Sequence, residues 1–298
     1  MLYLGELAAI ITSLTYAVNS ALFTVAGRKV GSIVVNRIRL LAASLFLTLA
    51  HLIFLGTLWP VDATLDRWIW LGISGIVGLV LGDAFLFQAF VWVGPRISML
   101  MMSLAPIIAS LTAWIFLGET LSPWQITGIL ITLIGVGWVV VDKNQGQDFK
   151  NGNYMRGILY GLGGAAGQGL GLVLAKKGLG GNFSPISANF IRMISAMILI
   201  WMITIFQKQF KSTINSVITN PGALRAILGG AFSGPFLGVS LSLYALQHTN
   251  IGIASTLMAL PPIFLLPVEI IFFKERLGWG AIAGTLIAMA GVGVLFLV

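Results

Sequence analysis

Ten long apolar runs follow one another along this chain of 298 residues. A helix needs roughly 20 apolar residues to cross the hydrocarbon core of a bilayer, and each run has about that length. Only 9% of the residues are charged, whereas soluble domains carry about 25%, so lipid must cover most of the surface. We therefore expect an all-α integral membrane protein. Its expected spans are 4–26, 33–55, 67–92, 97–117, 123–141, 155–175, 186–206, 223–246, 251–273 and 279–297.

The distribution of basic residues fits the same class of protein. The formal net charge is +8, which in a soluble protein would suggest a nucleic-acid partner. Here the lysines and arginines lie mainly in short loops between apolar runs, where they orient membrane helices, so we expect no nucleic-acid binding. They gather in the odd-numbered loops, which predicts that these loops face the cytoplasm and that both termini lie outside. The first run lacks a cleavage site, and we interpret it as a retained helix.

The second half of the chain repeats the first. A shift of 156 residues lays 97–137 on 253–293 without a gap, and 16 of the 41 paired residues are identical. Chance would give about 3 or 4 identities, so the match indicates a duplication. Each copy holds five of the expected spans. We expect a first repeat at 1–142, a polar linker at 143–154 and a second repeat at 155–298.

An odd number of helices in each copy constrains the topology. After five crossings, the second copy must enter the bilayer from the opposite side. The sequence therefore predicts ten transmembrane helices as two inverted-topology five-helix repeats. Secondary transporters commonly have this architecture, with the binding site near the bilayer midplane between the halves.

Two short motifs recur at equivalent positions of the halves, one containing proline and one containing glutamate. They are Ala105-Pro106, Gly118-Glu119-Thr120-Leu121, Pro261-Pro262 and Lys274-Glu275-Arg276-Leu277. Together with the repeat, these motifs resemble the EamA branch of the drug/metabolite transporter superfamily, although Lys274 replaces the usual glycine. The resemblance covers nearly the whole chain. It implies a transporter with a central cavity reached alternately from each side, and it implies neither a particular substrate nor a universal ligand-binding motif.

Polar residues that repeat in both halves are expected to serve the fold. Glu119 and Glu275 repeat at helix ends, where we interpret them as caps or partners of basic groups. Arg39 and Arg192 repeat as well. We expect them near a membrane face, where they anchor headgroups or bridge helices rather than bind substrate.

Two carboxylates have no acidic counterpart in the other half. Asp83 aligns with Val239 and lies ~14 Å from the end of its span, near mid-membrane. A carboxylate at that depth is costly, so it suggests a proton carrier or a partner for a substrate amine, with helix packing as the alternative. Glu269 either faces the cavity or pairs with Lys274, about one turn away.

Polar stripes on otherwise apolar helices suggest the lining of the cavity. Thr12, Thr15, Tyr16 and Asn19 share one helix face, and hydrogen bonds between helices are the alternative reading of that pattern. A similar stripe runs through the eighth span, and one amide lies in the sixth. The expected substrate-binding residues are Tyr16, Asn19, Asp83, Met102, Gln168, Ser240, Tyr244 and Glu269.

Glycines and prolines add two expectations about packing. The sixth span holds seven glycines between 157 and 171, which favours close helix approach over phosphate binding. Pro106 and the Pro261-Pro262 pair are expected to kink the fourth and ninth helices near mid-membrane.

The sequence gives little support to an enzymatic function. Gly72-Ile73-Ser74-Gly75 has the GxSG form of intramembrane serine proteases, and His51 and His248 are the candidate partners of Ser74. In a chain with 36 glycines such a match arises easily. The chain has no cysteine and no carboxylate pair at metal-ligand spacing, so we expect no metal and no cofactor.

These features predict a secondary transporter of a small metabolite, with export of an amino acid or related amphiphile as the first choice. A lipid-carrier flippase and an importer of sugar or nucleotide-type metabolites are the alternatives, and an intramembrane serine protease is a remote one. Proton coupling stays open. The expected partners are a small-molecule substrate and membrane lipid, with the protein acting as a monomer. We expect it in the plasma membrane, most plausibly a bacterial inner membrane.

Overall fold

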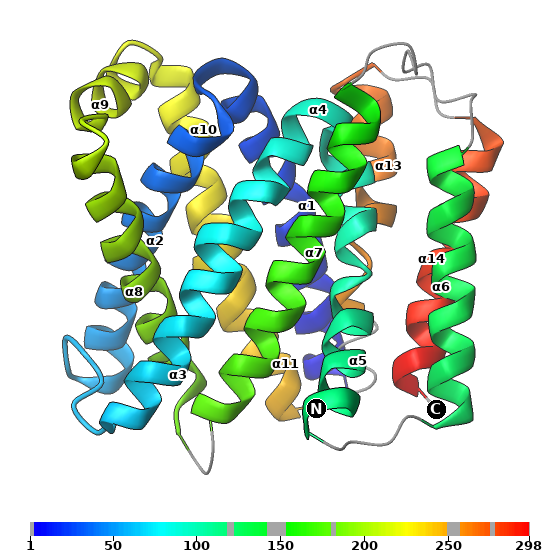
Figure 1. The fold of residues 1–298 in the computed structure, drawn as a ribbon, viewed down its shortest axis with the longest axis horizontal. Helices are drawn as coiled ribbons and strands as arrows, with labels where there is room; N and C mark the ends of the chain where they lie inside the picture. The colour runs from blue at the N-terminus through cyan, green and yellow to red at the C-terminus, as the bar shows by residue number, and fades with distance from the viewer. Residues whose placement is uncertain are drawn as a thin grey trace.

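The computed structural model describes residues 3–117, 122–141, 153–179, 183–248, 257–274 and 278–297, and the regular secondary structure in these ranges is entirely helical. Six of the described helices are long and apolar enough to cross a membrane. The long helices stand side by side, and both chain termini lie at the lower edge of Figure 1.

The helices of the first half are α1 (Leu4–Val30), α2 (Ser32–Leu55), α3 (Leu65–Gly75), η1 (Ile76–Gly82), α4 (Asp83–Met102), α5 (Ala105–Leu117) and α6 (Pro123–Val141). Those of the second half are α7 (Asn153–Gly178), α8 (Pro185–Phe206), α9 (Phe210–Ile218), α10 (Pro221–Ala231), η2 (Phe232–Gly238), α11 (Val239–His248), α13 (Pro261–Ile271) and α14 (Trp279–Leu297).

Each half contains a π-helical segment, and the two segments lie at equivalent positions of the repeat. The segments η1 and η2 are π-helical, and η2 begins 156 residues after η1, the shift that aligns the repeated sequence. A π-helical turn displaces backbone carbonyls from the regular α-helical bonding pattern, and such turns are frequent at functional sites. Each π-segment leads directly into an α-helix, α4 in the first half and α11 in the second.

The two halves exchange their first helices. Helix α7 packs along α3, η1 and α4 of the first half, whereas α1 packs along α10, η2 and α11 of the second. The expectation that glycines let α7 approach closely is confirmed. A Cβ on Gly167 would collide with the backbone of Gly82, and one on Gly171 would lie against Gly78. On the other flank, a Cβ on Gly75 would collide with the backbone of Arg192. Segment η1 is therefore held tightly between α7 and α8.

Helices α6 and α14 form a close antiparallel pair, seen at the right of Figure 1. A Cβ on Gly135 would collide with the backbone at Gly284, and one on Gly291 would collide with Thr132. The Thr132 hydroxyl lies 3.5 Å from the carbonyl oxygen of Ala288. Because Thr132 and Ala288 are 156 residues apart, the two helices meet at equivalent positions of the repeat.

The prolines begin helices rather than kink them, so the expected mid-helix kinks are corrected. Ser103 and Leu104 form a turn, and Pro106 follows in the first turn of α5. Pro261 and Pro262 open α13. The first N–H groups of a helix have no acceptor within the helix, so proline loses nothing there.

Helix α4 lies between the two largest apolar clusters. One cluster joins α4 to α5, α6, α7 and α14, and the other joins it to α1, α2 and α10. After Val93 the chain turns at Gly94, whose φ of 80° suits glycine, and Pro95 starts the final stretch of α4. Helix α4 thus carries Asp83 at its start and Arg96 just beyond this turn.

Candidate functional site

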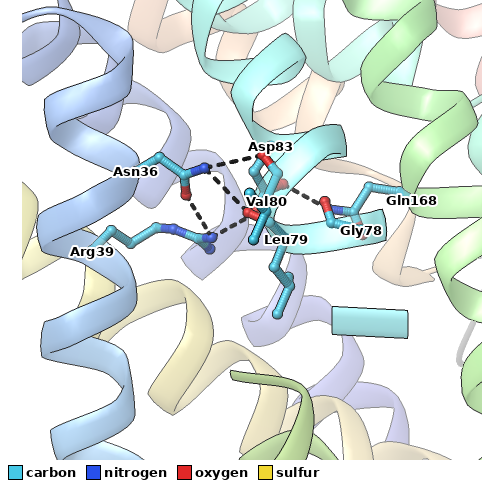
Figure 2. Close-up of polar contacts among 7 residues, drawn as sticks. All are labelled: Asn36, Arg39, Gly78, Leu79, Val80, Asp83 and Gln168. Carbon is cyan, nitrogen blue, oxygen red and sulfur yellow. Dashed lines mark hydrogen bonds and ion pairs between the residues drawn. The ribbon is translucent and has the colours of Figure 1, made fainter. Parts of the chain in front are cut away.

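The centre of the polar site is a buried ion pair between α2 and α4 (Figure 2). The Nη2 atom of Arg39 lies 2.6 Å from Oδ2 of Asp83, and the two side chains are only 6% and 5% exposed. A charge that far from water must be neutralised by a partner and by hydrogen bonds. The neighbouring helices provide both.

Asn36 connects this pair to the carbonyls of η1. It lies one turn before Arg39 on the same face of α2, and its Oδ1 accepts a hydrogen bond of 3.1 Å from Arg39 Nη2. Its amide nitrogen donates to the carbonyl oxygens of Leu79 and Val80, at 3.2 and 3.5 Å. Asn36 thereby links Arg39 to two carbonyls of the π-helical segment (Figure 2).

The second half of the chain supplies two further groups. Gln168 of α7 donates from Nε2 to Asp83 Oδ1 at 2.6 Å and to the Gly78 carbonyl at 3.2 Å. Arg192 of α8 interacts electrostatically with Asp83 and with Tyr16 of α1. The Tyr16 hydroxyl in turn hydrogen-bonds the side chain of Ser242. Helices α1, α2, α7 and α8, from both halves, therefore converge on Asp83 of α4 or its neighbours.

The charges of this cluster do not balance. Arg39 forms the ion pair with Asp83, and Arg192 is a second cation whose charge acts on the same carboxylate without an ion-pair contact among the described residues. The Nε atoms of both arginines are buried and have no hydrogen-bond partner among the described residues. An arginine presents five N–H donors in a planar fork that matches a carboxylate or phosphate. The cluster therefore holds N–H donors that no described acceptor uses.

A second buried ion pair joins α4 to α13. Arg96 Nε lies 2.6 Å from Glu269 Oε2, its backbone N–H donates to Oε1 at 3.1 Å, and both side chains are 1% exposed. The turn at Gly94 exposes this backbone N–H to the glutamate. The pairing of Glu269 with Lys274 that the sequence suggested is therefore replaced by one with Arg96, a residue of the other half.

The structure brings together three of the predicted site residues. Gln168 contacts Asp83 directly, and Tyr16 reaches the same cluster through Arg192. Asn19 lies against η2, where a Cβ on Gly234 would collide with its amide.

Two of the other predicted residues, Met102 and Tyr244, are described by their burial. Met102 is half-buried and packs against both large apolar clusters. Tyr244 is 38% exposed on α11. Ser240 belongs to α11 as well, and its side chain lies outside the described residues, as do Glu119 and Glu275.

Sequence reasoning missed the arginines. Arg39 is buried within the bundle and paired with Asp83, which excludes the expected headgroup anchor in this conformation, whereas its role in bridging helices is confirmed. The signal was present, because Asn36 and Arg39 recur as Asn189 and Arg192 with the same spacing. The sequence shows only that the two arginines occupy equivalent positions. The fold shows that both lie near the same aspartate.

The residues of the GxSG motif serve helix packing. The Ser74 hydroxyl donates to the Gly171 carbonyl at 2.6 Å, which ties α3 to α7. His51 instead lies 3.2 Å from the Ser187 hydroxyl. No cluster of potential metal ligands occurs among the residues that the structure describes.

Comparisons with known proteins agree with this architecture. The model of the EamA-like transporter family matches the chain twice, at residues 3–141 and 155–297. A solved structure titled only "Crystal structure of protein" is similar, with a TM-score of 0.59 and 17% identity over 97% of this chain and 96% of that chain. At that identity the likeness concerns the fold alone. No curated protein matches the sequence.

Proposed function

Because the chain belongs to the EamA-like transporter family, we propose that it is a secondary transporter that moves a small metabolite by alternating access. The family match spans nearly the whole chain, and the long apolar helices make it a multi-pass membrane protein. Its cargo site is the polar cluster around Asp83, where helices of both repeats converge.

The proposal includes ten crossings in two repeats of inverted topology. Both termini lie at one edge of the bundle, and η1 and η2 are separated by the repeat shift. Helices α6 and α14 run antiparallel and meet at Thr132 and Ala288, which are equivalent positions. A two-fold axis in the membrane plane brings equivalent residues together in this way.

The proposed substrate class rests on the charges of the cluster. With two arginines and one carboxylate, the empty site has one positive charge in excess. The carboxylate of an amino acid or a related amphiphile neutralises this charge, and Arg192 is the group that receives it. The Tyr16 hydroxyl lies beside this position. Export is the proposed direction, following the resemblance to amino-acid and metabolite exporters.

The transport cycle must open a site that is closed in this conformation. Arg39 and Asp83 are almost fully buried, so substrate entry requires helices to separate at one face. Since α1 and α7 exchange partners between the repeats, the bodies that move are mixed bundles rather than the two sequence halves. The Arg96–Glu269 pair between α4 and α13 is the contact that opens at its end of the molecule. Protonation of Asp83 would release Arg39, which gives a route to proton coupling.

Counterflow in liposomes tests the proposal. The purified protein is reconstituted and supplied with labelled amino acids, sugars and cationic drugs, with and without a pH gradient. We expect saturable counterflow of a carboxylate-bearing solute. The Asp83→Asn variant removes one charge at nearly constant shape, and Asp66→Asn makes the same change at an exposed residue as the matched control.

Other outcomes of this experiment would indicate a different function, substrate class or site. Flux that rises linearly with concentration identifies a pore, and chemical conversion of the solute identifies an enzyme. Counterflow of sugars or cations alone contradicts the proposed substrate class. Equal activity of Asp83→Asn and wild type contradicts the proposed site.

The proposed location is the plasma membrane of a bacterium, with both termini outside. The excess of basic residues in the odd-numbered loops supports this orientation. A reporter active only in the cytoplasm, fused after Val298, should stay silent. Activity there would reverse the orientation.

A further inference from the structure

A second polar site lies away from the Asp83 cluster, at the end of the bundle that carries α9. An open groove of about 360 Å³ runs between the turn joining α1 to α2 and helix α9. Polar and apolar residues line it, with contributions from α2, α4 and α9. The polar residues that matter here are Ser32, Arg37, Gln88, Gln209, Thr213 and Ser216.

Arg37 is the only charged residue in the lining of this groove, and it is 4% exposed. Its Nη1 donates to the Thr213 hydroxyl at 2.8 Å, and its Nη2 donates to Oε1 of Gln209 at 2.7 Å and of Gln207 at 3.4 Å. Its Nε has no hydrogen-bond partner among the described residues. All three acceptors are neutral side chains, so the hydrogen bonds orient the guanidinium without neutralising its charge.

Arg37 differs from two other buried arginines in that its charge is not paired with any described carboxylate. Arg39 and Arg96 each lie 2.6 Å from a carboxylate. Within the described part of the chain, Arg37 has no carboxylate at ion-pair distance. A buried cation without a counter-charge is costly, and an anion from outside the chain removes that cost.

The surrounding sequence repels cations and attracts anions. Segments 26–38 and 207–225 border the groove and contain four lysine or arginine residues besides Arg37 and Arg225, with no acidic residue in either. Lys208 has a φ of 56°, and this tight turn between α8 and α9 places Gln207 and Gln209 on the same guanidinium. The chain accepts a strained backbone here to orient one arginine.

Helix α9 places the groove at the depth of lipid headgroups. It has nine residues, with Phe210 and Ile218 exposed and Thr213 and Val217 buried against the bundle. The Phe210 ring packs edge-on against Trp201 of α8. Short amphipathic helices with exposed aromatic and aliphatic residues lie in the membrane interface, where phosphates of lipids are concentrated.

We propose that this groove binds a phosphate group, with Arg37 as its charged ligand. The guanidinium supplies the positive charge at the wall of the groove, and the groove offers hydroxyl and amide donors to the phosphate oxygens. The Ser32 hydroxyl donates to Gln88 Oε1, which leaves the Gln88 amide nitrogen as such a donor. The headgroup of an anionic membrane lipid and a free phosphate share this chemistry. The site is independent of the proposed transport function.

Thermal unfolding with defined additives tests the site. The full-length protein is melted in detergent with added phosphatidylglycerol, phosphatidylcholine or inorganic phosphate, and retained lipids are weighed by native mass spectrometry. We expect phosphatidylglycerol to raise the melting temperature and phosphatidylcholine to leave it unchanged. Arg37→Gln should bind phosphatidylglycerol roughly 10-fold more weakly, because it loses the charged donor.

A matched variant separates this site from general charge attraction. Lys211→Gln removes one exposed cation from α9, the helix that borders the groove, and should bind phosphatidylglycerol as wild type does. If Arg37→Gln does not fold, the wild-type lipid comparison still decides, together with Arg37→Lys, which keeps the charge and loses the fork. Stabilisation by inorganic phosphate without preference between the lipids assigns the site to a soluble phosphate. Equal stabilisation by both lipids with no effect of phosphate, or equal loss in Lys211→Gln, overturns the proposal.

Discussion

Helix α4 contributes to both buried ion pairs, which have the same N–O distance of 2.6 Å and differ in the side chains around them. Arg39–Asp83 sits among Asn36, Gln168 and Arg192, and its surroundings hold one positive charge in excess. Arg96–Glu269 is 1% exposed on both sides, with Arg28 as a more distant cation. The first is an open pair, extended by polar side chains of other helices, and the second is a closed pair in which Arg96 binds both oxygens of Glu269.

This difference separates two roles that a list of buried charges would merge. A pair that shares its hydrogen bonds with polar side chains of several helices is suited to exchange partners when a substrate arrives. A closed pair between α4 of the first repeat and α13 of the second is suited to stabilise one conformation. Its contribution to transport is then through the equilibrium between conformations, since a contact shifts that equilibrium only by what it adds to one state.

Removing the carboxylate of the open pair should have the largest effect. Asp83→Asn leaves Arg39 and Arg192 buried without a counter-charge, which costs about 3–5 kcal/mol. We expect counterflow to fall by roughly 100-fold, a conversion of about 2.7 kcal/mol. The measurement is initial counterflow rate per folded protein, with folding checked by size-exclusion chromatography. A rate within twofold of wild type would show that the pair is only a packing element.

Removing the excess charge should weaken binding specifically. Arg192→Gln retains Asp83 and its ion pair with Arg39 but leaves the cluster neutral. We expect KM for a carboxylate substrate to rise roughly 10-fold with a smaller change in the maximal rate, because one charge-assisted contact is lost. Arg192→Lys should recover part of the affinity. An unchanged KM would remove Arg192 from the site.

Opening the closed pair should change rates and stability without changing affinity. Glu269→Gln leaves Arg96 uncompensated and should lower the free energy of unfolding by about 3 kcal/mol. We expect KM within about twofold of wild type and a several-fold change in maximal rate. Replacing both partners by leucine should restore much of the stability. A large rise in KM from Glu269→Gln would place the glutamate at the substrate instead.

A substitution outside both pairs gives the baseline. Ser74→Ala removes one hydrogen bond between α3 and α7 and should cost about 1 kcal/mol in stability. Counterflow should stay within about twofold of wild type. Loss of counterflow together with loss of a peptide-cleaving activity would support the protease alternative.

The fold followed from sequence more fully than the site did. Apolar length and the repeat predict membrane helices and two related halves, because both depend on many residues at once. Asp83 stood out because it lacks a counterpart, and Gln168 because it is a lone amide on an apolar helix. The partners of Asp83 could not be predicted, because Arg39 and Arg192 reach it through glycine contacts and displaced carbonyls of η1 that leave no signature in residue type. The same holds for Arg96, which the Gly94 turn places against Glu269.

The joint between α6 and α14 bears on how such a chain arises. Gly135 contacts Gly284, and Gly128 contacts Gly291, and the shift of 156 residues converts one contact into the other. A surface that satisfies this condition binds a second copy of itself. A five-helix ancestor would therefore have carried a ready-made homodimer interface before its gene was fused in tandem. Since then, each glycine of the joint has been free to mutate alone, and two separately expressed polypeptides, 1–142 and 153–298, should still find one another in a membrane.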